Sequence, residues 1–478
     1  MKKIIITVLT IALVISCQTD KQYEDLNRDP KNPTQVEAEF LFNAATKSLF
    51  DQMTSTNVNT NIFRLLSQYW TETTYTDEAN YDFNGRNITQ AHWSEMYRDV
   101  LLDLKTAKEN VDADSQLSES QKQAMNAQIE VLAIYTWQQL VDSFGDIPYS
   151  QALNAGQFVL PAYDDAATIY LDLIDRLNAA IPNINGTGFG SADPIYGGDA
   201  AAWTKFANSL LLRIGIRIAD APGMTSTSQA AIQAAVAGGV FTSNDDNASL
   251  NYEAAPPNTN PVWNELVQSG RSDFVSANTI IDFMNNLNDP RRAYYFRENL
   301  GAGVFQGGTY GATSSYANNS QVGDIMHEPT NPASLIDFAE VSFYLADAAE
   351  RSISGTPADA AGFYNQAITA SFDYWGAPNV ATYLANPDVN YATAPGTWRE
   401  KIGNQFWLAM YNRGFEGWTA WRTYDTPTFN LPADSGLPVP TRYTYPINEQ
   451  NLNEANWSAA SAAIGGDEQT TKLFWDVN

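Results

Sequence analysis

Residues 128–148 read QIEVLAIYTWQQLVDSFGDIP, and this stretch decides the fold class. Its apolar residues recur with a spacing close to 3.6, which is typical of an α-helix rather than a strand. Gly145 permits a turn that ends a helix, and Pro148 prevents the helix from continuing. We therefore expect a long helix over residues 120–144, followed directly by a sharp turn.

The same spacing of apolar residues dominates the chain on both sides of this stretch. Alternating patterns typical of strands are scarce and short, so the predicted fold class is mainly α with little strand. The other predicted helices cover residues 36–53, 61–70, 91–110, 164–181, 201–219, 276–287, 335–351, 359–375, 398–411 and 416–424.

Two consecutive helices carry a pairing pattern. Tyr344 and Ala348 lie on the first helix, and Ala360, Tyr364 and Ala367 lie on the second. These spacings approximate the tetratricopeptide repeat, in which small residues let two helices approach each other and aromatic side chains fill the groove. The first half of the pattern recurs at Trp203-Phe206-Ala207-Leu210 and, more loosely, at Trp93-Met96-Tyr97-Val100. The pattern favours a tetratricopeptide-type scaffold of helix pairs over the alternative, an ordinary all-α protein with amphipathic helices.

Long irregular segments rich in Gly, Asn, Ser, Thr and Tyr interrupt the helices. The main ones cover residues 71–89, 243–272, 299–327 and 427–446. Loops beyond about 15 residues inside a compact protein are usually functional or disordered. These loops contain many aromatic residues, so we expect them to be ordered. A helical scaffold that carries long aromatic loops is typical of a binding protein.

The N-terminus has the layout of an export signal. Lys2 and Lys3 precede a twelve-residue apolar run, which is too short to span a bilayer as a helix of about 20 residues. The only cysteine, Cys17, directly follows the small Ser16 and is the expected lipid-attachment residue of a bacterial lipoprotein. We predict a signal peptide at residues 1–16, a lipidated tether at residues 17–34 and a single domain at residues 35–478. An ordinary secreted protein with one stray thiol is the alternative.

The net charge of the chain excludes one class of partner. At −27, the surface repels phosphate backbones, so we expect no nucleic-acid binding. With one cysteine, the chain cannot form an internal disulfide. Its stability must therefore come from a packed core, and a chain of this length can supply one.

Several short motifs follow one another along the chain. They are Gly145-Asp146-Ile147-Pro148; Trp203-Thr204-Lys205-Phe206 with Arg213 and Arg217; Asn288-Asp289-Pro290-Arg291; Ala339-Glu340-Val341; Gln405-Phe406-Trp407; Glu416-Gly417-Trp418 with Trp421-Arg422; and Thr441-Arg442-Tyr443-Thr444-Tyr445-Pro446. In this order they resemble the motifs of the SusD/RagB family, and the resemblance covers essentially the whole chain. One departure is Thr423, where the family often has a second arginine. We interpret Arg213, Arg217 and Glu340 as structural ion pairs or snorkelling side chains rather than ligand contacts.

The resemblance implies a lipoprotein on the outer membrane that faces the cell exterior. Such a protein captures an oligosaccharide and passes it to a SusC-like TonB-dependent transporter, on which it acts as a lid. The alternatives are a RagB-like peptide-binding protein with the same lid role, a surface glycosidase, and a pure scaffold. The implied binding is non-covalent and needs no cofactor.

Residues that could carry catalysis or hold a metal ion are few. The chain has two histidines, His92 and His327, in separate segments, and no metalloprotease, serine-hydrolase or paired-cysteine motif. Asp245, Asp246 and nearby oxygen side chains could hold Ca²⁺, but a solvated turn is the favoured reading. We expect neither catalysis nor a bound metal.

The long loops supply the candidate ligand-binding residues. Sugars present apolar C–H faces and hydroxyl rims, so their sites combine exposed aromatic rings with Asn, Asp, Gln and Arg. The candidates are Trp70, Tyr75, Tyr81, Asn84, Trp263, Arg271, Asp273, Tyr310 and Tyr316. Among them, Trp70, Tyr81, Trp263 and Tyr310 are the predicted stacking platforms. The alternative for each aromatic residue is a packing role inside the loops, and burial distinguishes the two.

Overall fold

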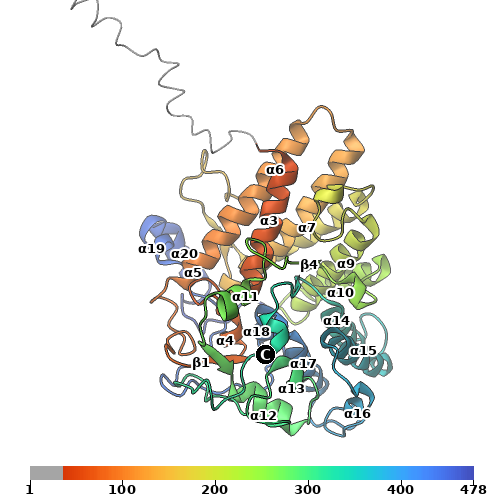
Figure 1. The fold of residues 1–478 in the computed structure, drawn as a ribbon. Helices are drawn as coiled ribbons and strands as arrows, with labels where there is room; N and C mark the ends of the chain where they lie inside the picture. Colours follow the sequence, from red (N-terminus) through yellow and green to blue (C-terminus); the bar gives the residue numbers. More distant parts are fainter. Residues whose placement is uncertain (1–35, 478) are drawn as a thin grey trace, which may run out of the picture.

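A computed structural model describes residues 36–477, and it confirms a mainly α fold with little strand (Figure 1). The α-helices are α3 Ala38–Thr54, α4 Phe63–Leu66, α5 Ile88–Ser94, α6 Leu102–Ala113, α7 Glu119–Phe144, α8 Ala166–Ala180, α9 Ala200–Arg217, α10 Thr225–Gly238, α11 Pro261–Trp263, α12 Asn278–Asn286, α13 Arg292–Tyr295, α14 Phe338–Glu350, α15 Pro357–Trp375, α16 Val380–Leu384, α17 Trp398–Ala409, α18 Gly414–Tyr424, α19 Ile447–Leu452 and α20 Glu454–Ala463. Two π-helices, η1 Glu95–Leu101 and η5 Asn264–Gln268, extend α5 and α11. The predicted signal peptide, tether and Cys17 lie outside the described residues.

The strands of the described region form three short antiparallel pairs. Strand β1 Trp70–Glu72 pairs with β5 Phe274–Ser276, β2 Ile147–Pro148 with β3 Tyr163–Asp164, and β4 Ser249–Leu250 with β6 Ala333–Ser334. Each pair joins segments that are separated in the sequence, so the strands tie loops together rather than form a core layer.

Helix α7 is the predicted long helix, and its C-terminal half is buried on all sides. Ser118 and Gln121 form a capping box at its start, and Gly145, with φ +86°, ends it. The closing segment of the chain holds the turn that follows. The Arg442 guanidinium donates to the carbonyl oxygen of Phe144 at 2.8 Å, and the Tyr445 hydroxyl donates to that of Asp146 at 2.8 Å. The turn is therefore fixed by a segment about 300 residues away in the chain.

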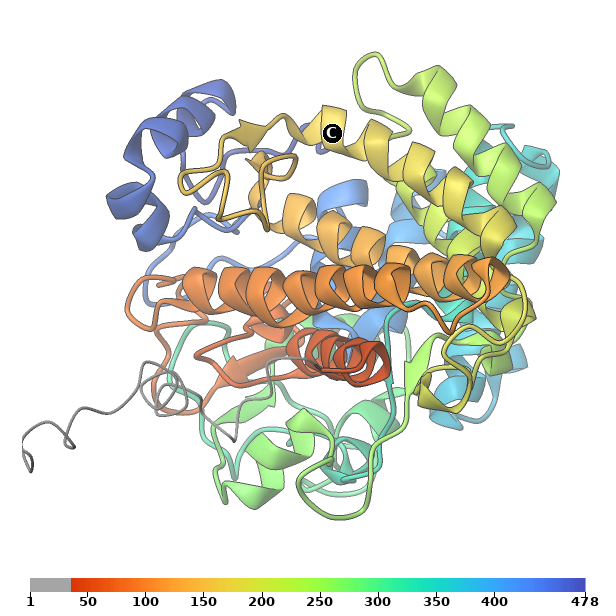
Figure 2. The same cartoon turned by 90° about the horizontal axis from the view of Figure 1, so that it is seen from above.

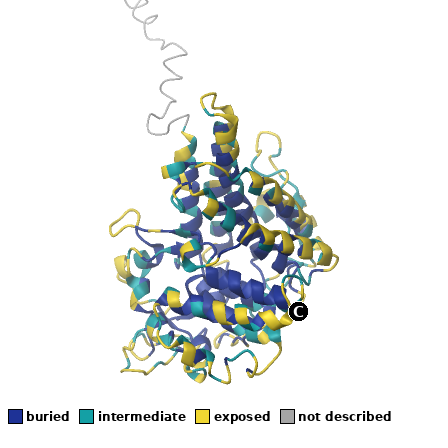
Figure 3. Ribbon diagram, turned by 90° about the vertical axis from the view of Figure 1, so that its right-hand side faces the viewer, coloured by how far each residue is buried: buried dark blue, intermediate teal, exposed yellow. Residues whose placement is uncertain are grey.

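Helices pack in neighbouring pairs, as the predicted helix-pair scaffold requires. Helices α3, α6, α7 and α8 lie side by side across the molecule (Figure 2), and α9 pairs with α10, α14 with α15, and α17 with α18. The small residues of the α14–α15 pattern, Ala348 and Ala360, are fully buried, which lets these two helices approach closely. Figure 3 shows that buried residues lie on the sides of the helices that face the interior, and that exposed residues lie on the sides that face outward.

The structure corrects two details of the predicted elements. The helix expected over residues 61–70 covers only Phe63–Leu66, because Gln68 has a positive φ of 55° and Trp70 begins strand β1. Helix α10 was not predicted, because it has few large apolar residues to reveal its period. Among residues 36–477, no helix combines the length and apolar character that crossing a membrane requires.

Buried ion pairs confirm the structural interpretation of the arginines. The Arg213 guanidinium on α9 lies 2.6 Å from the Glu340 carboxylate on α14, and both side chains are fully buried. Arg217 lies 3.4 Å from Glu416 in the same region. Arg291 and Asp289 of the turn before α13 form a second buried pair at 2.6 Å.

Candidate functional site

A polar pocket opens where β1 ends and β5 begins, and it brings together the loops that follow β1 and precede β5. Beyond the paired strands, the backbone N–H of Thr73 donates to the carbonyl oxygen of Asp273 at 2.9 Å, which holds the two loops side by side. The pocket encloses about 220 Å³. Its lining residues are Val58, Glu72, Thr74, Tyr75, Arg86, Arg271 and Asp273.

One buried carboxyl group, that of Glu72, lines the pocket, and a second, that of Glu78, lies behind it. Glu72 is 3% exposed and Glu78 is fully buried. Burial, a hydrogen bond to Glu78 and the charge of Glu78 together raise the pKa of Glu72 from its usual value to about 9. Glu72 also accepts a hydrogen bond from the backbone N–H of Ala79 at 2.9 Å. At neutral pH the Glu72 carboxyl group is therefore protonated.

The rim of the pocket is charged and carries one aromatic ring. Arg86 forms an ion pair with Glu78 through its Nε, and its side chain is 35% exposed. Arg271 lies 3.8 Å from Asp273, with side chains 60% and 47% exposed. Tyr75 is 73% exposed, so its ring is free to contact a ligand. An open aromatic face beside hydrogen-bond donors and acceptors matches the two surfaces of a sugar.

The size of the pocket limits what it can hold. Pockets for drug-sized ligands enclose roughly 300 to 1,000 Å³, and this pocket encloses about 220 Å³. The pocket therefore accommodates one sugar ring or one side chain of a longer ligand, and the remainder of the ligand extends over the surrounding loops.

Three of the predicted ligand residues, Tyr75, Arg271 and Asp273, line this pocket. Asn84 is exposed in the same loop but does not line it. Trp263, on α11, and Tyr316 are partly exposed and also lie outside the lining.

The remaining three candidates, Trp70, Tyr81 and Tyr310, are buried, and the prediction that they form stacking platforms is wrong. The indole N–H of Trp70 donates to the Tyr411 hydroxyl at 2.8 Å. The hydroxyl of Tyr310 donates to the carbonyl oxygen of Leu65 at 2.8 Å, and its ring packs against that of Tyr81. These aromatic residues hold the loops together, which was the alternative reading.

Glu72 and Arg86 were not predicted as site residues. Arg86 is the only cationic residue between residues 71 and 89, among four acidic ones, and that imbalance was the available signal. Glu72 gave no comparable signal in the sequence. Its side chain lines the pocket because the backbone of β1 pairs with that of β5, and this pairing is visible only in the structure.

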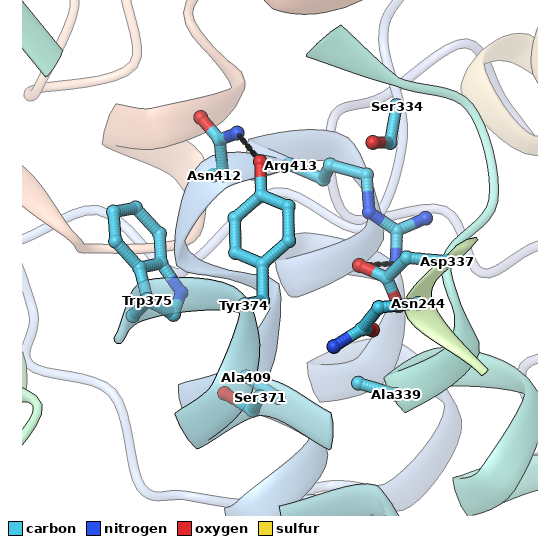
Figure 4. A pocket seen from close by; sticks show the side chains of 10 residues that line it. All are labelled: Asn244, Ser334, Asp337, Ala339, Ser371, Tyr374, Trp375, Ala409, Asn412 and Arg413. Carbon is cyan, nitrogen blue, oxygen red and sulfur yellow. Dashed lines mark hydrogen bonds and ion pairs between the residues drawn. The ribbon is translucent and has the colours of Figure 1, made fainter. Parts of the chain in front are cut away.

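Two other cavities are less suited to a ligand. The one drawn in Figure 4 encloses about 10 Å³, which is room for one water molecule. Its polar groups serve the core: Asn412 donates to the Tyr374 hydroxyl at 2.8 Å, and Arg413 pairs with Asp337 at 2.9 Å. A groove of about 470 Å³ beside α7 and α8 has Trp137 in its wall, but that residue is only 5% exposed.

The described residues offer no group of three or more His, Cys, Asp or Glu side chains that could hold a metal ion. Asp246, one of the possible Ca²⁺ ligands, pairs with Lys205 at 2.7 Å and accepts from the backbone N–H of Thr242 at 2.6 Å. In the pocket, Glu72 and Glu78 are hydrogen-bonded to each other, whereas the carboxyl groups of a glycosidase stand about 5 to 9.5 Å apart.

Replacing Glu72 with glutamine is expected to stabilise the protein at pH 8 by on the order of 1 to 3 kcal/mol. The folded state holds the Glu72 proton up to a pKa of about 9, whereas the unfolded chain releases it near 4.5. Glu72 therefore destabilises the fold increasingly as pH rises through this window. A glutamine amide keeps the bond from Ala79 and donates to Glu78. Urea denaturation at pH 5 and pH 8 measures the effect, with the exposed Asp77→Asn as the control; an equal difference from wild type at both pH values would refute it.

The fold and the pocket together define a class: a binding protein in which a scaffold of helix pairs carries a polar site on ordered loops. The chain belongs to the SusD-like family described as "Starch-binding associating with outer membrane", which matches residues 30–446. The predicted SusD/RagB membership is therefore confirmed. No curated protein matches the chain.

Solved structures of SusD homologues share the fold. A chitin-binding protein is 25% identical, with a TM-score of 0.78, and the match covers 92% of this chain and 100% of that one. A chitin-binding SusD homologue from Flavobacterium johnsoniae is 23% identical, covers 92% and 99% of the two chains, and gives a TM-score of 0.77. A SusD homologue from Bacteroides uniformis is 24% identical, with 92% and 100% covered and a TM-score of 0.76.

Proposed function

We propose that this protein captures an oligosaccharide at the cell surface and that the pocket between β1 and β5 holds one of its sugar rings. The observation that carries the proposal is the combination in one pocket of the exposed Tyr75 ring, the paired Arg271 and Asp273, and the buried Glu72. The family description and the printed names of the chitin-binding relatives support a glycan over other ligands. Binding is non-covalent, without catalysis or cofactor.

The family also supports a place for the protein in polysaccharide utilisation. In this proposal Cys17 carries the lipid that anchors the chain to the outer membrane, and the single domain of residues 35–478 faces the cell exterior. The bound oligosaccharide passes to a SusC-like TonB-dependent transporter, on which the protein acts as a lid. The lid role predicts a gene for such a transporter beside the gene for this protein, and its absence would contradict that role.

Peptide capture, as in RagB-like proteins, is the second candidate. One observation favours it: three of the predicted sugar platforms are buried, and among residues 36–477 Tyr75 is the only aromatic residue that lines the pocket. The oppositely charged Arg271 and Asp273 could also contact peptide termini.

Replacing Tyr75 with alanine is expected to weaken glycan binding at least tenfold, because stacking on an aromatic ring contributes about 1 kcal/mol or more beside its buried area. Affinity electrophoresis of residues 18–478 against a panel of soluble polysaccharides measures this. Phe40→Ala is the matched control, because Phe40 is an aromatic residue 65% exposed on α3, outside the pocket.

The expected result is retardation of the wild type and of Phe40→Ala by one polysaccharide, and loss of that retardation in Tyr75→Ala. Free migration in every gel contradicts glycan capture and moves the proposal to peptides, which calorimetry with a peptide library then tests. Retardation that Tyr75→Ala retains contradicts the position of the site.

A further inference from the structure

The pocket offers more free hydrogen-bond donors than acceptors, and this imbalance starts with Arg86. A guanidinium carries five N–H donors. Among the described residues, the only hydrogen-bond partner of Arg86 is Glu78, which binds its Nε. The two terminal nitrogens of Arg86, on a side chain 35% exposed, remain available to a ligand in the pocket.

Arg271 adds a second set of free donors. Its nearest carboxylate, that of Asp273, lies 3.8 Å away, which is beyond the hydrogen-bond range of about 3.2 Å. The side chain of Arg271 is 60% exposed and forms no hydrogen bond with another described residue. An exposed pair of this kind contributes little to stability, so a ligand can recruit the Arg271 guanidinium at low cost.

The carboxyl groups of Glu72 and Glu78, in contrast, are engaged within the protein, and Asp273 is the lining residue whose carboxylate has no hydrogen bond within residues 36–477. Glu72 accepts from the N–H of Ala79 and donates its proton to Glu78, while Glu78 also accepts from Arg86. Because Glu72 is neutral, the pocket has no net charge: Arg86 balances Glu78, and Arg271 balances Asp273. The surrounding charge of −27 is screened beyond about 8 Å at physiological ionic strength.

We infer that the sugar ring held in this pocket carries a carboxylate, so that the ligand is a glycan containing uronic acid. This inference rests on the proposed glycan-binding function. Two guanidinium groups that line one pocket suit a carboxylate, which each can bind with two parallel hydrogen bonds. Tyr75 contacts the apolar face of the ring, and the carboxylate lies between Arg86 and Arg271.

Pairs of monosaccharides that differ only in the carboxylate test this inference: glucuronate and glucose, galacturonate and galactose, mannuronate and mannose. Their dissociation constants are measured by NMR titration with the wild type, Arg86→Gln and Arg271→Gln. Arg297→Gln is the matched control, because Arg297 is 32% exposed and pairs with Asp324 outside the pocket. The Arg86→Gln variant leaves Glu78 without its cation, which could disturb the loop. The Arg271→Gln variant changes an exposed side chain and is expected to fold in either case.

At least one uronate is expected to bind tenfold or more tightly than its neutral partner. That ratio should fall toward one in Arg271→Gln and persist in Arg297→Gln. The inference is overturned if no uronate binds at millimolar concentrations or if none binds more tightly than its neutral partner. In that case, if neutral sugars or polysaccharides still bind and the binding is lost in Tyr75→Ala, the proposed glycan capture stands. If no sugar or polysaccharide binds, the result contradicts both the glycan capture and the uronic-acid inference.

Discussion

Replacing Glu340 with glutamine is expected to lower the free energy of unfolding by about 3 kcal/mol, because two buried guanidinium groups lose the carboxylate that they share and each keeps only one other carboxylate, Glu416 for Arg213 and Asp337 for Arg413. Glu340 lies on α14 with its side chain fully buried. Its two carboxylate oxygens accept from Arg213 on α9, at 2.6 and 2.9 Å, and one of them also accepts from Arg413. A neutral amide can hydrogen-bond to one of these groups but cannot balance two guanidinium charges.

The lowered pKa of Glu340 shows how strongly Arg213 and Arg413 favour its charged form. Burial by itself would raise the pKa of Glu340, but the charges of Arg213 and Arg413 outweigh it and hold the pKa below its usual value. The carboxylate is therefore ionised throughout the physiological range. Glu416, 3.1 Å from Arg213, remains in the variant and limits the loss.

Urea denaturation followed by circular dichroism measures this difference. The control is Glu350→Gln at the C-terminal end of the same helix, where the side chain is only half-buried and its recorded partner is the Tyr391 hydroxyl. We expect the control to change the free energy of unfolding by less than about 1.5 kcal/mol. A Glu340→Gln variant as stable as the control would show that the two arginines find compensation elsewhere.

The helices were predictable from the sequence wherever a large apolar face marks their period. Helix α7 and the pair α14–α15 are examples, since aromatic and aliphatic residues recur along each. Helix α10 escaped prediction because its buried residues are Ser228, Ala231, Ile232 and Ala235, of which only Ile232 is a large apolar residue, so no period is visible.

The candidate site was predictable only in part, because contacts between distant loops decide which aromatic residues are exposed. Tyr81 and Tyr310 belong to different loops, and their ring centroids lie 6.2 Å apart. Tyr75 lies in the same loop as Tyr81 and has a similar local sequence, yet it is exposed. No local pattern separates the two residues. The charged residues Arg271 and Asp273 are exposed in the pocket lining, because charged groups stay near water, and their role in binding stays a prediction.

Acidification is expected to destabilise the protein through His92, which is buried in a position that requires the neutral ring. Gln52 donates to Nδ1 of His92 at 2.9 Å, and Nε2 of the ring lies 3.2 Å from the Ser143 hydroxyl, which itself donates to the carbonyl oxygen of Gln139. This network assigns the ring proton to Nε2. A second proton on Nδ1 would face the Gln52 amide, which is a donor as well.

The direction of the pH dependence follows from the two pKa values. Burial lowers the pKa of His92 in the folded protein to about 3, whereas the unfolded chain binds this proton near 6.5. Below pH 6.5 the unfolded state therefore holds more protons than the folded state, and stability falls as pH falls toward 3. Between pH 7 and pH 4 the expected loss from His92 alone is about 3 kcal/mol.

Comparing the wild type with His92→Gln isolates this contribution from that of the carboxyl groups, which titrate in both proteins. Glutamine does not titrate, so the variant should be less stable than the wild type at pH 7, because it loses ring packing against Phe63. Its deficit should shrink by about 3 kcal/mol as the pH is lowered to 4, when the wild type alone has to exclude a proton from its histidine. Free energies of unfolding from urea denaturation at half-unit pH steps give both curves. Parallel curves from pH 7 to pH 4 would mean that the folded protein admits a proton to His92, which requires the Gln52 amide to rotate and accept a hydrogen bond from it.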